Sequence, residues 1–181
     1  FNVGRNEDPL GKIRDFSAAM DEGAARGADI ALMKLCYIDF NAKTDARQLA
    51  EAYISGLDAL SQKYPDTRFV AVTAPLAAVQ TGPKALVKRL LGKQPAQYIE
   101  NAKRAEFNEL VRAHYKSGSR LFDLARVEAD GGGTHTVVRV AGRDVEALDP
   151  ALTDDGGHLN ERGELLAATE FLNVIGAIPA K

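Results

Sequence analysis

Residues 28–40 read ADIALMKLCYIDF, and this stretch decides the fold class of the chain. It is almost continuously apolar, as expected of a parallel strand that is covered on both faces. Residues 68–73, RFVAVT, predict the next strand, and residues 44–63 between the two carry apolar side chains at helical spacing. A strand, a helix and a strand in succession predict a βαβ unit. The sequence therefore indicates an α/β fold with a parallel sheet.

The same alternation continues on both sides of this unit. Further helices are predicted over residues 11–20, 97–115 and 160–175, and a further strand over residues 120–124 with Asp123 inside it. In the last helix we expect Leu165, Leu166, Leu172 and Ile175 to face the core. Residues 134–148 interrupt the alternation, and Ala141-Gly142 within them indicates an inserted β-hairpin near the active face. A short basic helix over residues 84–91 is expected to be a solvated face.

The composition of the chain argues against several classes of protein, including nucleic-acid-binding and membrane-spanning proteins. The chain has 181 residues, of which 45% are hydrophobic and 27% charged, with a formal net charge of −2, and we expect one domain. This balance gives no electrostatic reason to expect a nucleic acid partner, and no apolar stretch is long enough to span a membrane. Cys36 is expected to be a buried structural thiol. His135 has no second histidine or cysteine at ligand spacing, so neither a metal nor another cofactor is expected.

Asp155 and His158 stand three residues apart in a glycine-containing turn before the last helix. A carboxylate beside an imidazole can fix its tautomer and stabilise the imidazolium that forms when the ring accepts a proton from a hydroxyl. Such a pair is typical of nucleophilic catalysis. The competing interpretation is an ordinary turn in which Asn160 caps the helix and the histidine is simply exposed.

The block Asp155-Gly-Gly-His158-Leu-Asn-Glu-Arg-Gly163 resembles the last signature block of the SGNH (GDSL-like) hydrolases. The order of strands and helices is similar over nearly the whole chain. The resemblance implies a flavodoxin-like, three-layer α/β/α fold and a Ser-Asp-His triad in which Asp155 and His158 are the second and third members. The loop of residues 1–6 is similar to the second block, which implies a backbone donor at Gly4 for the oxyanion, with Asn6 beside it.

Two parts of the family pattern differ in this chain. Residues 36–39, Cys-Tyr-Ile-Asp39, replace the usual Gly-x-Asn-Asp, so Lys34, Tyr37 or Asn6 would have to supply the missing donor. No Gly-Asp-Ser motif precedes Phe1, and none of the serines lies at a strand-to-helix turn; they are Ser17, Ser55, Ser61, Ser117 and Ser119. We therefore expect the domain to lack its first strand, with the nucleophilic serine upstream of Phe1. Removal of an N-terminal segment would favour a secreted or periplasmic protein.

These observations lead to three hypotheses. The first is an SGNH-type serine esterase acting on a small-molecule ester or an acylated glycan, with Asp155 and His158 in the triad. The second is an inactive domain of the same fold that binds a ligand without turnover. The third is a flavodoxin-like module for a phosphate-bearing ligand, which is weakest because the chain has no known phosphate loop. The sequence leaves the oligomeric state open.

Overall fold

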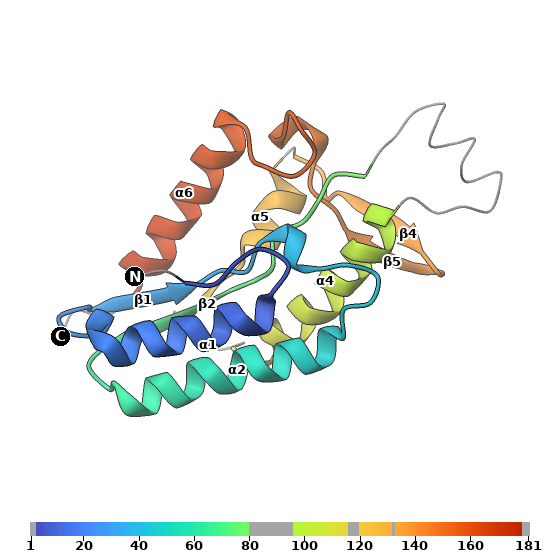
Figure 1. Cartoon of the computed structure of the whole chain (residues 1–181). Coiled ribbons are helices and arrows are strands. Elements are labelled where there is room, and N and C mark those ends of the chain that lie inside the picture. The colour runs from blue at the N-terminus through green and yellow to red at the C-terminus, as the bar shows by residue number, and fades with distance from the viewer. Residues whose placement is uncertain (1–2, 80–95, 116–119, 132, 179–181) are drawn as a thin grey trace.

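A parallel β-sheet of three strands lies at the centre of the computed structural model, which describes residues 3–79, 96–115, 120–131 and 133–178 (Figure 1). The strands are β1 (Ile30–Met33), β2 (Arg68–Val72) and β3 (Leu121–Phe122), and their spatial order is β1-β2-β3. In register, Met33 of β1 lies opposite Ala71, which in turn lies opposite Leu121 of β3. The carboxyl ends of all three strands therefore meet at one edge of the sheet.

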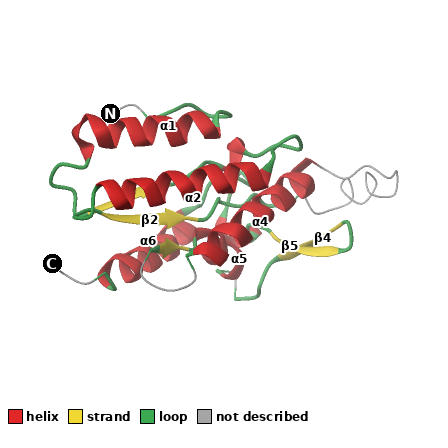
Figure 2. Ribbon diagram, turned by 90° about the horizontal axis from the view of Figure 1, so that it is seen from below, coloured by secondary structure: helices red, strands yellow, loops and turns green. Residues whose placement is uncertain are grey.

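Helices cover both faces of this sheet (Figure 2). They are α1 (Pro9–Ala19), α2 (Ala46–Lys63), α4 (Ala96–His114), α5 (Leu124–Asp130) and α6 (Glu161–Gly176). A π-helical turn (Met20–Ala24) continues α1, and 3-10 turns occur at Tyr37–Asp39 and Pro150–Leu152. The side chains of α1, α2 and α4 share one core with the sheet, and those of α5 and α6 pack on the opposite face. The chain thus has the mixed α/β fold that the sequence predicted.

The central strand β2 shows why the sheet is stable. Phe69 and Ala71 point into the core under α2, whereas Val70 and Val72 point toward α6, and all four are buried. The Tyr53 hydroxyl on α2 donates to the Met33 carbonyl (2.7 Å) and accepts from the Val72 N–H (2.8 Å). This one buried side chain fixes the ends of β1 and β2, where polar loops follow.

Short polar side chains start four of the helices. An oxygen of each accepts a hydrogen bond from a backbone N–H of the first turn, which satisfies a donor that the helix itself cannot pair. These caps are Asp8 for α1, Asp45 for α2, Asp123 for α5 and Asn160 for α6. The helix starts expected from the sequence for α1, α2 and α6 lie within a few residues of their caps, but no helix was expected after Asp123.

The expectation that the first strand runs on to Asp39 is wrong. β1 ends at Met33, and the Asp39 carboxylate closes a 3-10 turn by accepting the Cys36 N–H at 2.7 Å. β1 is also not covered on both faces, because Leu32 is 38% exposed. Among the described residues no strand pairs with the outer edge of β1. Cys36 is only half-buried, contrary to the expected buried thiol.

Two expectations near the C-terminus also need correction. Asp123 is not inside a strand, because β3 ends at Phe122 and the Asp123 carboxylate caps α5. Leu165 and Leu172 do not face the core: α6 rests on the sheet through Phe171 and its neighbours, and both leucines are exposed. Their spacing marked an apolar stripe on the helix, but spacing alone could not show which part of that stripe meets the sheet.

Beyond the sheet, β4 (Val137–Val140) and β5 (Arg143–Glu146) pair antiparallel where the sequence predicted a hairpin. The turn residues Ala141 and Gly142 both have positive φ, as a two-residue turn of type I′ requires. The basic helix predicted for residues 84–91 lies outside the described residues. None of the helices in the described part of the chain has the length and apolarity needed to cross a bilayer.

Candidate functional site

Asp155 and His158 form a hydrogen-bonded pair in the turn before α6. Oδ2 of Asp155 lies 2.6 Å from Nδ1 of His158, and Oδ1 accepts the backbone N–H groups of His158 and Gly157, both at 2.8 Å. These hydrogen bonds, that from the His158 backbone foremost, hold the pKa of Asp155 well below its ordinary value. An ionised Asp155 favours the proton on Nδ1 and leaves Nε2 of His158 free to accept one.

The turn that carries the pair is held against neighbouring loops. Gly156 has a φ of +87°, and its carbonyl accepts the Ala78 N–H at 2.8 Å, which joins the turn to the segment after β2. A Cβ on Gly157 would lie 2.6 Å from Cζ of Tyr37, so the Tyr37 ring fits against this glycine because it has no side chain. The turn therefore has little freedom to move away from the ends of β1 and β2.

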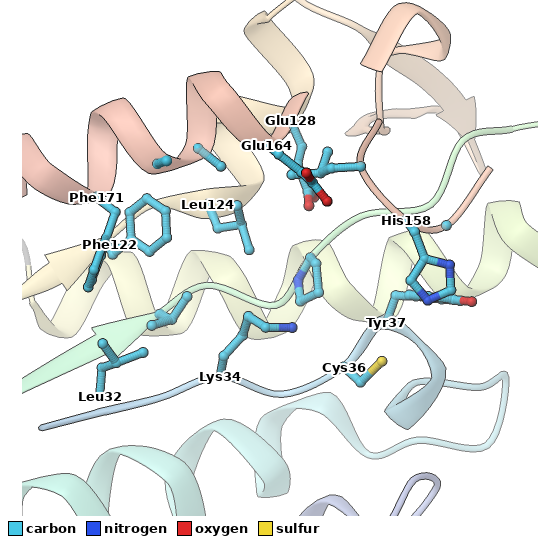
Figure 3. A pocket seen from close by; sticks show the side chains of 16 residues that line it. Leu32, Lys34, Cys36, Tyr37, Phe122, Leu124, Glu128, His158, Glu164 and Phe171 are labelled. Carbon is cyan, nitrogen blue, oxygen red and sulfur yellow. The ribbon is translucent and has the colours of Figure 1, made fainter. Parts of the chain in front are cut away.

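His158 stands at the mouth of a groove of about 560 Å³ between the sheet and α6. Figure 3 shows Lys34, Glu128 and His158 facing this opening, with Tyr37 beside His158. Apolar side chains from the strands, from α5 and α6 and from the loops beside them form most of the remaining wall: Leu32, Val72, Pro75, Phe122, Leu124, Leu159, Ala167, Ala168 and Phe171. The His158 side chain is 72% exposed, so the groove is open to water at this end.

A second hollow, of about 620 Å³, lies on the other side of β1. Gly4, Asn6 and Lys12 line it, and Leu32 and Lys34 line both hollows. The two hollows thus flank the unpaired outer edge of β1. Of the residues singled out in the sequence, Tyr37, Lys34 and His158 share the first hollow, and Gly4, Asn6 and Lys34 share the second.

Asp39 occupies a different kind of position from the other candidate residues. It is buried and forms an ion pair with Lys12, whose Nζ lies 2.9 and 2.7 Å from the two carboxylate oxygens. The same carboxylate accepts the Glu7 N–H at 3.0 Å, and Lys12 also donates to Oδ1 of Asn6 at 3.2 Å. Asp39 therefore lines neither hollow and instead fixes the loop that carries Gly4 and Asn6.

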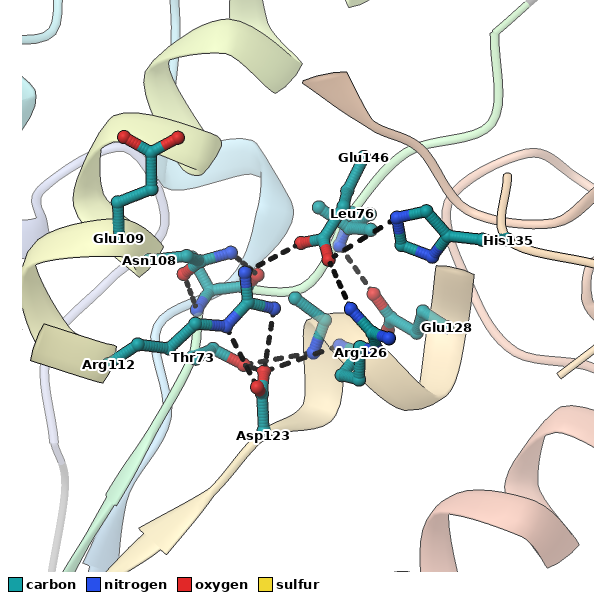
Figure 4. Close-up of polar contacts among 12 residues, drawn as sticks. Thr73, Leu76, Asn108, Glu109, Arg112, Asp123, Arg126, Glu128, His135 and Glu146 are labelled. Carbon is teal, nitrogen blue, oxygen red and sulfur yellow. Dashed lines mark hydrogen bonds and ion pairs between the residues drawn. The ribbon is translucent and has the colours of Figure 1, made fainter. Parts of the chain in front are cut away.

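Glu128 is a residue of the groove that the sequence did not single out. Its side chain comes from α5, is 2% exposed, and accepts the Leu76 N–H at 2.5 Å (Figure 4). Burial raises the pKa of Glu128 to about 8, although the Leu76 hydrogen bond and the nearby cations Lys34 and Arg104 oppose the rise. A signal was present, because Glu128 shares the apolar helical face of Leu124 and Ala125, but no helix was predicted over residues 124–130.

Arg104 on α4 was missed for a similar reason. It is 1% exposed and interrupts the buried face of the helix together with Asn101 and Asn108. The apolar residues of this helix predicted it from their spacing, and polar residues at the same spacing carry no weight in such a pattern. Polar residues on a buried helix face mark a buried hydrogen-bond network, and that was the signal available.

The remaining histidines have other partners. His135 lies 2.6 Å from Asp130 and 3.9 Å from Glu146, within a cluster that also contains Arg112 and Arg126 and joins the hairpin to α4 and α5 (Figure 4). His114 lies 2.7 Å from Asp58 on the surface of α2. Within the described ranges no group of three or more His, Cys, Asp or Glu side chains is placed to hold a metal ion.

Comparison with known proteins adds no family assignment to this geometry. No protein-family model matches the chain, and no curated protein sequence matches it.

Proposed function

We propose that this chain belongs to an SGNH-type serine esterase that hydrolyses a small acyl ester. The observation that carries the proposal is the 2.6 Å contact between Asp155 and Nδ1 of His158, at the mouth of a groove beside the carboxyl ends of parallel strands. In this proposal His158 is the general base and Asp155 orients it. The overall architecture would be the flavodoxin-like, three-layer arrangement with an inserted hairpin.

The outer edge of β1 offers a place for the strand that would carry the nucleophilic serine. A parallel strand added at this edge would lie between the two hollows, and its carboxyl end would reach the level of Lys34. A serine there would have His158 on one side and Gly4 on the other. We propose that the nucleophilic serine occupies this place and lies outside residues 1–181. Ser17, Ser55 and Ser61 lie within α1 and α2, on the opposite face of the sheet from α6.

The loop before α1 supports an oxyanion site. Gly4 has a φ of +64°, which lets its backbone pass within contact distance of Lys12. Because Oδ1 of Asn6 accepts from Lys12, the Asn6 amide group keeps its own N–H donors for another acceptor. Lys34, which lines both hollows, adds a positive charge nearby. Donors fixed before the reaction are what stabilises the negative charge of a tetrahedral intermediate.

The test uses the native protein that contains these residues. We expect it to hydrolyse p-nitrophenyl acetate and to be labelled by a fluorophosphonate probe at a serine outside residues 1–181. His158→Ala and Asp155→Asn should each lower kcat/KM by on the order of 10⁴-fold. His135→Ala is the matched control, because His135 also pairs with an aspartate at 2.6 Å but lies outside the groove. Full activity in His158→Ala would overturn the proposal.

A ligand-binding domain without turnover is the second candidate. It is favoured by the lining of the groove, in which no described residue is a serine or a threonine. For this candidate the native protein would bind an ester without hydrolysing it, and the fluorophosphonate probe would label no serine. Labelling of a serine together with His158-dependent turnover would refute it.

A further inference from the structure

Arg104 and Asn101 form a buried polar pair on one face of α4. Nη1 of Arg104 donates to Oδ1 of Asn101 at 2.7 Å, and both side chains are almost fully buried. Burying a guanidinium is costly unless its donors are paired. Two further donors of Arg104, Nε and Nη2, bind the Tyr37 carbonyl at 3.3 and 2.7 Å, and Nη2 also lies 3.6 Å from a carboxylate oxygen of Glu100 on the same helix. Glu100 thus balances the charge of the guanidinium, and two of its N–H donors hold the backbone carbonyl of Tyr37.

The turn that contains Tyr37 is one of two segments that hold His158 in place. Its carbonyl is held by Arg104, and the preceding Cys36 N–H is held by Asp39. The Tyr37 ring meets the His158 ring edge to face, with centroids 5.4 Å apart and planes at 83°. Figure 3 shows the two side chains beside each other. Because its backbone is fixed, this ring limits how far the imidazole can turn about its contact with Asp155.

Asn101 holds residues 77–78, the second segment that contacts the turn with His158. Its Oδ1 accepts the Ala77 N–H at 3.1 Å, and its Nδ2 donates to the Ala77 carbonyl at 2.7 Å. The next residue, Ala78, donates to the carbonyl of Gly156, inside the turn that carries the Asp155 and His158 pair. One buried pair on α4 therefore fastens the two segments that flank this turn.

We propose that Arg104 and Asn101 are positioning residues for His158, acting through Tyr37 on one side and through residues 77–78 on the other. The inference rests on the proposed function in taking His158 as the catalytic base. Neither residue lines the groove, so neither touches a substrate there. Their effect is on the direction in which Nε2 of His158 points. In an active native protein, Arg104→Met should lower kcat by on the order of 10-fold to 100-fold with little change in KM.

A readout that needs no turnover separates this inference from the proposed function. We would record the imidazole ¹H and ¹³C resonances of His158 by NMR in the 181-residue chain, in wild type, Arg104→Met, Tyr37→Leu and the double variant. Both single variants should move these resonances in the same direction, and the double variant should move them little further, because the two residues act in one path. Arg112→Met is the control, since Arg112 lies on the same helix but pairs with Asp123 and Glu146.

The possible results of these measurements distinguish a failure of the positioning role from a failure of the proposed esterase. Unchanged His158 resonances in folded Arg104→Met, or in Tyr37→Leu if the arginine variant does not fold, would overturn the inference. Equal changes in Arg112→Met would also overturn it, since the effect would then be general loosening of α4. Shifted resonances in a chain whose native form hydrolyses no ester would support the positioning role and refute the esterase.

Discussion

Glu128→Gln should make the stability of this protein less sensitive to pH. The glutamine keeps an oxygen that can accept the Leu76 N–H, which wild-type Glu128 accepts at 2.5 Å, but it cannot ionise. In wild type, burial raises the pKa of Glu128 from 4.5 in the unfolded chain to about 8. The folded state therefore holds a proton that the unfolded state releases above pH 4.5.

The sign and size of the effect follow from this difference. A carboxyl group whose pKa is higher in the folded state contributes its full stability below the unfolded pKa and loses it as pH rises through the folded pKa. Each unit of difference between the two pKa values corresponds to about 1.36 kcal/mol. Wild type should thus lose on the order of 5 kcal/mol of unfolding free energy between pH 4.5 and about pH 8 through Glu128 alone.

Urea unfolding followed by far-ultraviolet circular dichroism measures this directly. The unfolding free energies of wild type and Glu128→Gln, compared at each pH, should diverge steadily in favour of the variant as pH rises, and level off above about pH 8. Glu51→Gln is the control, because Glu51 is exposed on α2 and its carboxylate faces water in both states. A constant difference between wild type and Glu128→Gln at all pH values would show that Glu128 is ionised in the folded protein, and the burial argument would be refuted.

Two further substitutions test the surroundings of the site. Lys12→Met should cost about 3–5 kcal/mol of unfolding free energy, because it leaves Asp39 buried without its cation. Lys63→Met breaks an exposed pair and should cost much less, so equal losses by urea titration would contradict this reasoning. Gly157→Ala should displace the Tyr37 ring, which would otherwise lie 2.6 Å from the new Cβ, at a cost below about 1 kcal/mol; unmoved Tyr37 ring resonances would contradict it.

Helices α1, α2, α4 and α6 were predictable because local signals specify them, whereas α5 was not predicted. Thr44 and Asp45 before an apolar helical pattern are both possible caps, and Tyr64-Pro65 after it predicts the end of α2; in the structure the cap is Asp45. The Asp155 and His158 pair was also found in the sequence, since both partners lie in one turn and their spacing is local. The sequence predicted no more than their proximity, and the contact of their side chains came from the structure.

What the sequence did not yield depends on contacts between distant segments. The turn after β1 is held by Asp39, whose partners are Lys12 on α1 and Glu7 in the loop before that helix. Arg104 reaches the carbonyl of Tyr37, 67 residues earlier in the chain. Periodicity describes which residues of one element share a face, but it carries no information about what that face meets.

The strand order β1-β2-β3 follows the order of the chain, and this has a consequence for folding. Each strand finds its partner in the strand just before it, so the sheet can grow by sequential addition during synthesis from the N-terminus. The turn with Asp155 and His158 comes after all three strands and closes onto loops that are already in place. Assembly of the site is therefore a late event, and a nascent chain that ends near residue 150 would contain the whole sheet without the pair.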